Sequence, residues 1–282
     1  MSGTAMTIGP AVVGSMIASY LFGCSTMQTY TYCKRFPGDR RAFQILVAAV
    51  TILTFAHIIC TLYWTWTLTV TGCEDPDGVT IFSSSRDANL ILTPLISTLV
   101  QMFFIYRLFK LSGSKTVAAF CGILSMLNLT GTLVDAVGAL SISANRTAQN
   151  ARNWLTITTL VAATVCDLIT TIGLVYVLQR ERRRTTVHQT HNIADRLTLW
   201  AIETGLATSM SAVLVLVFFC VMRNTFFWAA IYDVLADVYT NSLLAALNSR
   251  KTTRIRDTRV IEFSAGRDTP SDPVSEKPEI VN

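Results

Sequence analysis

The chain has 282 residues, of which 51% are hydrophobic and only 15% are charged, and its mean hydropathy is +0.45. Charged residues make up about a quarter of an ordinary soluble domain, so this composition excludes a disordered chain and argues against a soluble one. The net charge of +5 comes from short clusters between long apolar runs. This pattern is typical of a multi-pass membrane protein.

Seven apolar runs of about twenty or more residues follow one another along the chain. They cover residues 8–32, 42–71, 90–110, 116–143, 153–178, 197–222 and 226–247. Each run can cross roughly 30 Å of hydrocarbon as a helix, and lipid offers unpaired backbone groups no other partner. We therefore expect an all-α membrane protein, with a seven-transmembrane helix bundle over residues 1–250. Residues 251–282 are expected to form a tail that is basic and then disordered.

The Lys and Arg residues are distributed unevenly between the two ends of the runs. Most of the 23 basic residues fall in the first, third and fifth connections and in the tail. Because cytosolic segments carry an excess of basic residues, the N-terminus is predicted outside and the C-terminus in the cytosol. Asn145 then lies in an outward loop, as the acceptor of the sequon Asn145-Arg146-Thr147, where glycosylation is expected to be permitted.

The same topology predicts which partners the chain meets. A basic cluster follows the last run directly and is expected to contact anionic lipids of the inner leaflet; it consists of Arg250, Lys251, Arg254, Arg256 and Arg259. Residues 179–196 form a basic inner loop that could hold a cytosolic transducer. Nucleic-acid binding is not expected, because no soluble stretch is long enough. The sequence leaves open whether the protein lies in the plasma membrane or an endomembrane, and it leaves the oligomeric state open.

Polar and ionisable residues inside the apolar runs are costly, so they predict a candidate intramembrane site. That site comprises His57, Gln101, Asp167, Glu203, Asp233, Asp237 and Asn241. Asp233, Asp237 and Asn241 recur every fourth residue and therefore share one face of a helix. The runs contain almost no basic residue to pair with these acids. They are expected to face the bundle interior, either as inter-helix hydrogen bonds or as a site for a cation, a proton or a polar ligand.

Known seven-helix chemistries do not fit the residue types present. Retinal attachment needs a Lys within the bundle, and every Lys lies at a membrane face or beyond it. An intramembrane zinc hydrolase needs several ligands, and the runs hold a single His. Asp233 and Asp237 share one helix and cannot face each other as a protease pair. We therefore expect no enzyme activity, no cofactor and no metal site.

Several motifs resemble a large family of fungal multi-pass membrane proteins that is classed as a domain of unknown function. The most specific is the segment 239–250, Tyr-Thr-Asn-Ser-Leu-Leu-Ala-Ala-Leu-Asn-Ser-Arg, which resembles the C-terminal signature of that family. Supporting motifs are Phe103-Phe104 with Arg107, Asp167, Thr204-Gly205-Leu206-Ala207-Thr208, and Tyr32 with Phe36-Pro37-Gly38-Asp39. Glu203 stands where the family has a neutral residue, often Asn. The resemblance implies a seven-helix bundle from a mushroom-forming fungus with no assigned activity, so no catalytic residue is carried over.

Three functions remain open at this point. The topology favours a receptor-like or sensory seven-helix protein, although helix seven has no Pro after its Asn and the outward N-terminus is short. The acidic stripe favours a small transporter or channel that uses the intramembrane site. A membrane scaffold, in which the acids serve packing, is the third interpretation.

Overall fold

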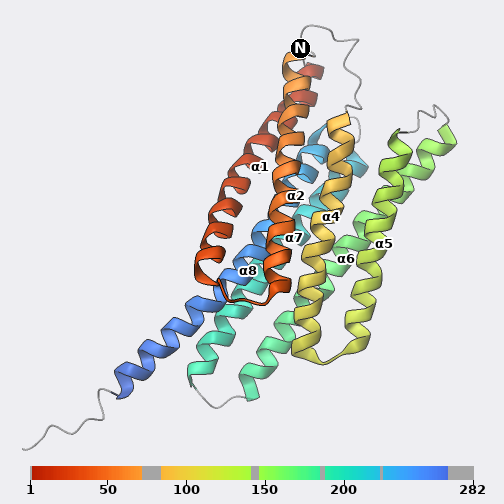
Figure 1. Cartoon of the computed structure of the whole chain (residues 1–282). Helices are drawn as coiled ribbons and strands as arrows, with labels where there is room; N and C mark the ends of the chain where they lie inside the picture. The colour runs from red at the N-terminus through yellow and green to blue at the C-terminus, as the bar shows by residue number, and fades with distance from the viewer. Residues whose placement is uncertain (1, 72–83, 141–145, 185–187, 223–224, 266–282) are drawn as a thin grey trace, which may run out of the picture.

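The computed structural model describes residues 2–71, 84–140, 146–184, 188–222 and 225–265 (Figure 1). Every regular element in these ranges is helical, which confirms the predicted all-α class. The helices are α1 (Ser2–Arg35), α2 (Arg41–Trp66) with its π-helical extension η1 (Thr67–Thr71), α4 (Ser84–Ser112), α5 (Lys115–Leu140), α6 (Arg146–Arg184), α7 (His188–Val221) and α8 (Phe227–Ala265).

Six of these helices are long and apolar enough to cross a membrane, among the residues that the structure describes. They are α1, α2, α4, α5, α6 and α7, and they indicate a multi-pass membrane protein. α8 is not apolar enough to be counted with them, so composition supports six membrane-spanning helices and not the predicted seven. The physical reason is that the part of α8 from 227 to 249 carries Asp233 and Asp237 together with several hydroxyl groups, which the bundle buries.

The outer surface of the bundle is apolar, as a lipid-facing surface must be. Large side chains stay uncovered on most helices, for example Ile52 on α2, Ile123 on α5 and Met210 on α7, each more than 60% exposed. A water-soluble protein of this size rarely leaves so many large apolar side chains uncovered. The exposed surface therefore agrees with the six apolar helices.

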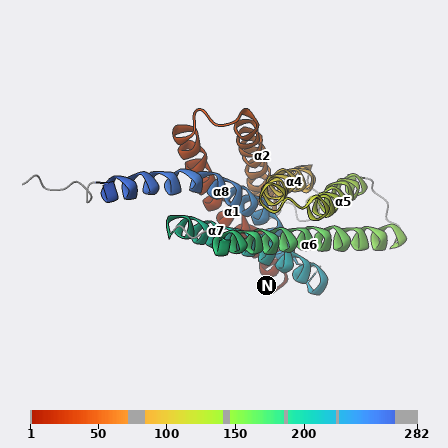
Figure 2. The ribbon, with the colours of Figure 1, turned by 90° about the horizontal axis from the view of Figure 1, so that it is seen from below.

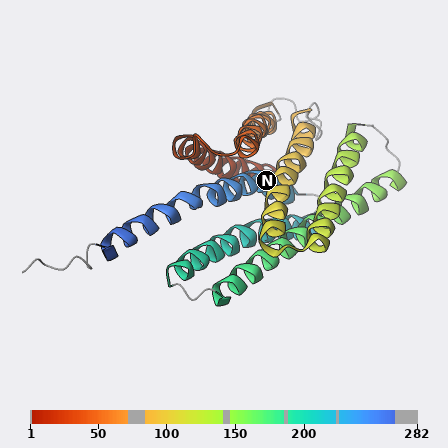
Figure 3. The same ribbon diagram turned by 60° about the horizontal axis from the view of Figure 1, so that its bottom comes forward.

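Helices α4 and α8 lie at the centre of the arrangement. α8 packs against α1, α2, α4 and α7, while α4 packs against α2, α5, α6 and α8. Seen from below, α8 lies between α1 and α7, and its C-terminal half extends beyond the other helices (Figures 2 and 3). The main apolar core includes Leu235, Leu243 and Leu247 of α8, together with Val50 and Val100 from α2 and α4. This core fixes the depth of α8 relative to its neighbours.

Local sequence accounts for the tight turns at one end of the bundle. Gly113 has φ +68°, a conformation in which other residues are strained, and its N–H donates to the Phe109 carbonyl at 2.9 Å to close α4. Between α1 and α2, Pro37 follows the end of α1, and the Tyr32 hydroxyl donates to the Asp39 carboxylate at 2.9 Å. Both turns bring the flanking helices side by side.

Two segments differ from their sequence predictions. The inner loop predicted at 179–196 is largely helical, because α6 continues to Arg184 and α7 begins at His188. The predicted tail also begins as helix, since α8 runs on to Ala265 without a break at residue 250. Residues 266–282 lie outside the described residues.

Candidate functional site

The predicted site residues fall into two separate groups on different faces of α8. Asp167 and Gln101 belong to the first group, which Tyr239 of α8 completes. His57, Asp233, Asp237 and Asn241 belong to the second. The reason for the split is helical geometry, because Asp237 and Tyr239 are two residues apart and thus about 200° apart around the α8 axis.

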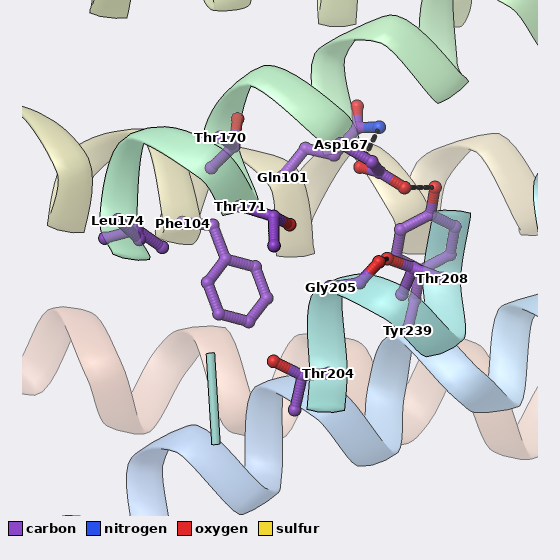
Figure 4. Close-up of a pocket in the computed structure, with 10 residues that line it drawn as sticks. All are labelled: Gln101, Phe104, Asp167, Thr170, Thr171, Leu174, Thr204, Gly205, Thr208 and Tyr239. Carbon is purple, nitrogen blue, oxygen red and sulfur yellow. Dashed lines mark hydrogen bonds between the residues drawn. The ribbon is translucent and has the colours of Figure 1, made fainter. Parts of the chain in front are cut away.

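The first group is a hydrogen-bonded network centred on the Asp167 carboxylate. Tyr239 donates its hydroxyl to one carboxylate oxygen at 2.6 Å, and Gln101 donates its amide to the other at 3.1 Å (Figure 4). The Gln101 carbonyl oxygen in turn accepts from the Ser125 hydroxyl at 2.8 Å. The network therefore ties α6, α8, α4 and α5 together, and it buries Asp167 almost completely.

A small cavity opens beside Asp167 and has room for one or two water molecules. Its wall is rich in hydroxyl groups and also contains two large apolar side chains, as Figure 4 shows; the lining residues are Gln101, Phe104, Asp167, Thr170, Thr171, Leu174, Thr204, Gly205, Thr208 and Tyr239. Gly205 is required where α7 approaches α6, because a Cβ atom there would run into the Thr171 side chain. The cavity thus lies where α6 and α7 come closest to α4 and α8.

The second group begins with a buried ion pair that the sequence did not reveal. Arg86 of α4 donates from Nη1 to both Asp233 carboxylate oxygens, at 2.9 and 3.0 Å. The guanidinium lies 4.8 Å from the centre of the Trp64 ring and 5.3 Å from that of Trp228. An Arg held between two indole rings and a carboxylate is stabilised by cation–π attraction and by charge-assisted hydrogen bonds.

Arg86 precedes the apolar run predicted at 90–110, and the sequence predicted almost no base within the runs to pair with the acids. The structure corrects this, because α4 begins at Ser84 and carries Arg86 into the bundle. A signal was present in the sequence, since Arg86 lies one helical turn before Asn89 and Leu90, at the start of a helical run. Periodicity alone could not show that Arg86 meets Asp233.

His57 and Asp237 are both completely buried at 0% exposure, and neither side chain has a hydrogen-bond partner among the described residues. Two contacts between the segments that carry them show how far along the bundle axis His57 and Asp237 lie relative to each other. The Thr54 and Thr240 hydroxyls lie 2.8 Å apart, and the rings of Trp64 and Phe226 are 5.5 Å apart. Trp64 follows Thr54 along the chain, whereas its partner Phe226 precedes Thr240, so α2 and α8 are antiparallel. His57 and Asp237 therefore occupy the same level, one turn from the Thr54–Thr240 contact.

Asn241 joins α8 to α1 through side-chain hydrogen bonds. Its amide donates to the Leu21 carbonyl of α1 and to the Asp237 carbonyl of its own helix, both at 2.9 Å, and its oxygen accepts from Gln28 at 3.0 Å. Asn248, two turns further along, donates to the Gln28 carbonyl. These contacts hold α1 against the polar face of α8.

The remaining predicted residues lie elsewhere. Glu203 is exposed on α7 and contributes to neither group. Asn145 lies outside the described residues, as do the side chains of Arg250, Lys251, Arg254, Arg256 and Arg259, although the backbone there is part of α8. Within the described ranges, no three His, Cys, Asp or Glu side chains are grouped closely enough to hold a metal ion.

The helices and their polar interior define an α-helical, multi-pass membrane protein. Residues 163–252 match the model of a protein family described as a family of unknown function, DUF6534. The matched segment contains eight of the ten cavity-lining residues, from Asp167 to Tyr239, and the whole stripe of Asp233, Asp237 and Asn241. No curated protein and no solved structure matches the chain.

Proposed function

We propose that this protein is a small transporter or channel that binds a monovalent cation, hydronium included, beside Asp167. The observation that carries the proposal is the Asp167 carboxylate at the edge of a hydroxyl-lined cavity inside the bundle. Carboxylate and hydroxyl oxygens are the ligands that hard cations prefer. A carboxylate has about four acceptor positions, and Asp167 uses two of them for Tyr239 and Gln101. The Phe104 ring also lines the cavity, and an aromatic ring can attract a cation.

The size of the cavity favours a small ion over the receptor-like interpretation. Sites for organic ligands usually enclose several hundred cubic ångströms, whereas this cavity has room for only one or two waters. A receptor-like or sensory role is kept as the alternative, and it depends on a cytosolic transducer at residues 179–196. The scaffold interpretation would require the Asp167 network to serve packing only.

Seven spans and an outward N-terminus are part of the same proposal. The contacts of α8 with α2 support α8 as a seventh span, because the segment from Phe226 to Thr240 runs antiparallel to α2 between Trp64 and Thr54. The buried polar side chains of α8 are compatible with a membrane span, because the surrounding helices shield them from lipid. The basic residues 250–259 would then meet anionic lipids of the inner leaflet. We propose no enzymatic activity.

Reporters fused to the two termini test this topology. We expect a glycosylation or alkaline-phosphatase reporter at the N-terminus to be active only outside, and a green fluorescent reporter at the C-terminus to be active in the cytosol. The physical reason is the excess of Lys and Arg at one end of the spans. Two termini in the same compartment would contradict an odd number of spans.

A flux assay tests the function itself. Purified protein in liposomes should dissipate a gradient of H⁺, Na⁺, K⁺ or NH₄⁺, each followed with an ion-sensitive dye, and Asp167→Asn should reduce that flux to the level of empty liposomes. Asn keeps the shape of Asp and a hydrogen bond from Tyr239 but lacks the charge that attracts a cation. Asp135→Asn is the matched control, since the Asp135 carboxylate accepts from Thr156 at 2.7 Å and does not line the cavity.

Two results would contradict the proposal. One is a wild-type protein that carries none of these ions while it is folded and inserted. The other is a flux that Asp167→Asn and Asp135→Asn reduce equally. Recovery of a cytosolic transducer by the 179–196 segment, together with absent flux, would favour the receptor-like alternative.

A further inference from the structure

Asp237 and His57 form a second buried feature that the Asp167 cavity does not explain. Both oxygens of the Asp237 carboxyl and both ring nitrogens of His57 lack a partner among the described residues. Native proteins rarely leave four such atoms buried and unpaired, so each one needs an explanation. A bound species at this level of the bundle would supply one.

The buried base nearest in position to Asp237 along α8 is already paired with another acid. Arg86 contacts both oxygens of Asp233, one helical turn away on the same face of α8. On the helices that pack against α8, the buried titratable groups of the described residues are His57 on α2, Arg86 and Asp87 on α4, and Tyr32 near the other end of α1; α7 buries none. An ionised Asp237 would therefore add a further carboxylate to Asp233 and Asp87, with Arg86 as the one buried Arg among the described residues of these helices.

An ionised carboxylate at this position would carry a large desolvation cost, because it is fully covered and receives no hydrogen bond. A protonated carboxyl avoids most of that cost, since it carries no net charge and has one O–H to donate. A charged His57 would also be costly, because an imidazolium would be buried near the positive Arg86 guanidinium. Two neutral groups fit this part of the bundle better than two charged ones.

We propose that Asp237 and His57 form a proton-binding site, in which the Asp237 carboxyl holds one proton beside a neutral His57 imidazole. The Thr54–Thr240 contact lies about one helical turn from the site in one direction, and the Arg86–Asp233 ion pair lies about one turn away in the other. The site is separate from the Asp167 cavity, which lies on the other face of α8. Loss of the proton would place an uncompensated charge between α2 and α8, so the site links proton binding to the packing of these helices.

Infrared spectroscopy of the purified full chain tests this proposal directly. At neutral pH the wild type should show the C=O stretching band of a protonated carboxyl, with the amplitude of one group. Asp237→Asn should lose that band, and the control Asp135→Asn should keep it. His57→Gln should keep the band but change the pH at which it disappears. If Asp237→Asn does not fold, Asp237→Glu should shift the band in frequency instead of removing it.

Two outcomes would overturn the proposal. A spectrum at neutral pH that is the same in the wild type and in folded Asp237→Asn would mean that Asp237 is ionised. Loss of the band when choline in the buffer is replaced by Na⁺ or K⁺ would mean that the site binds a metal cation in place of a proton. Neither result depends on flux through the Asp167 cavity, so this proposal and the proposed function can fail separately.

Discussion

Asp233→Asn is expected to lower the free energy of unfolding by about 3–5 kcal/mol, the usual effect of removing one partner of a buried ion pair. The substitution leaves the Arg86 guanidinium charged, because Arg does not lose its proton in proteins. Arg86 is 5% exposed and has no second acid bonded to it among the described contacts. The two indole rings beside it attract a cation but cannot neutralise its charge. Equilibrium unfolding in detergent micelles or bicelles measures the loss.

Asp237→Asn is the matched control for this prediction, since it removes the next acid along the same face of α8. Because the Asp237 side chain has no basic partner among the described residues, its replacement by a neutral isostere should leave the free energy of unfolding nearly unchanged. The double variant Arg86→Met with Asp233→Leu should recover most of the lost stability, as apolar replacements of buried ion pairs often do. Equal losses for Asp233→Asn and Asp237→Asn would contradict the assigned role of the ion pair.

Gly14→Val is expected to disrupt the packing of α1 on α8 and to reduce the free energy of unfolding by at least about 1–3 kcal/mol, the usual range for overpacking. A Cβ atom at Gly14 would lie 2.8 Å from the Ala230 Cβ and 3.0 Å from the Ala230 Cα. Backbone cannot move aside as a flexible side chain can, so the two helices must separate. Small residues at such crossings are what allow membrane helices to approach closely.

Gly23 on the same helix provides the control, because a Cβ atom there would meet nothing within 4 Å. Gly23→Ala should keep or slightly raise the free energy of unfolding, since Ala favours a helix over Gly by up to about 1 kcal/mol. Gly14→Ala should lower it. Cross-linking between cysteines introduced at the contact of α1 with α8 would report the separation directly. The opposite ranking of the two Ala variants would show that α1 and α8 do not pack as described.

The polar interior shows how far sequence reasoning could go. Ionisable residues in apolar runs predicted buried polar groups, and the four-residue spacing of Asp233, Asp237 and Asn241 predicted a shared face of one helix. The structure places all three on a covered face of α8. This face differs from the one that carries Tyr239, whose hydroxyl contacts Asp167 of α6. Glu203 met the same sequence criteria but is exposed on α7. Spacing within one helix cannot distinguish these cases, because it contains no information about the neighbouring helices.

By itself, the sequence determined the helical class and the membrane environment, because twenty-residue apolar runs must satisfy their backbone groups internally in lipid. Only the tertiary structure decided which polar groups meet. It brought Arg86 from the start of α4 to Asp233 of α8 and placed Trp64 and Trp228 beside the guanidinium. It also left the side chains of His57 and Asp237 without a hydrogen-bond partner among the described residues. The physical reason is that these contacts join helices far apart in the chain. Their formation depends on the crossing and depth of the helices, which are set by packing of the whole bundle.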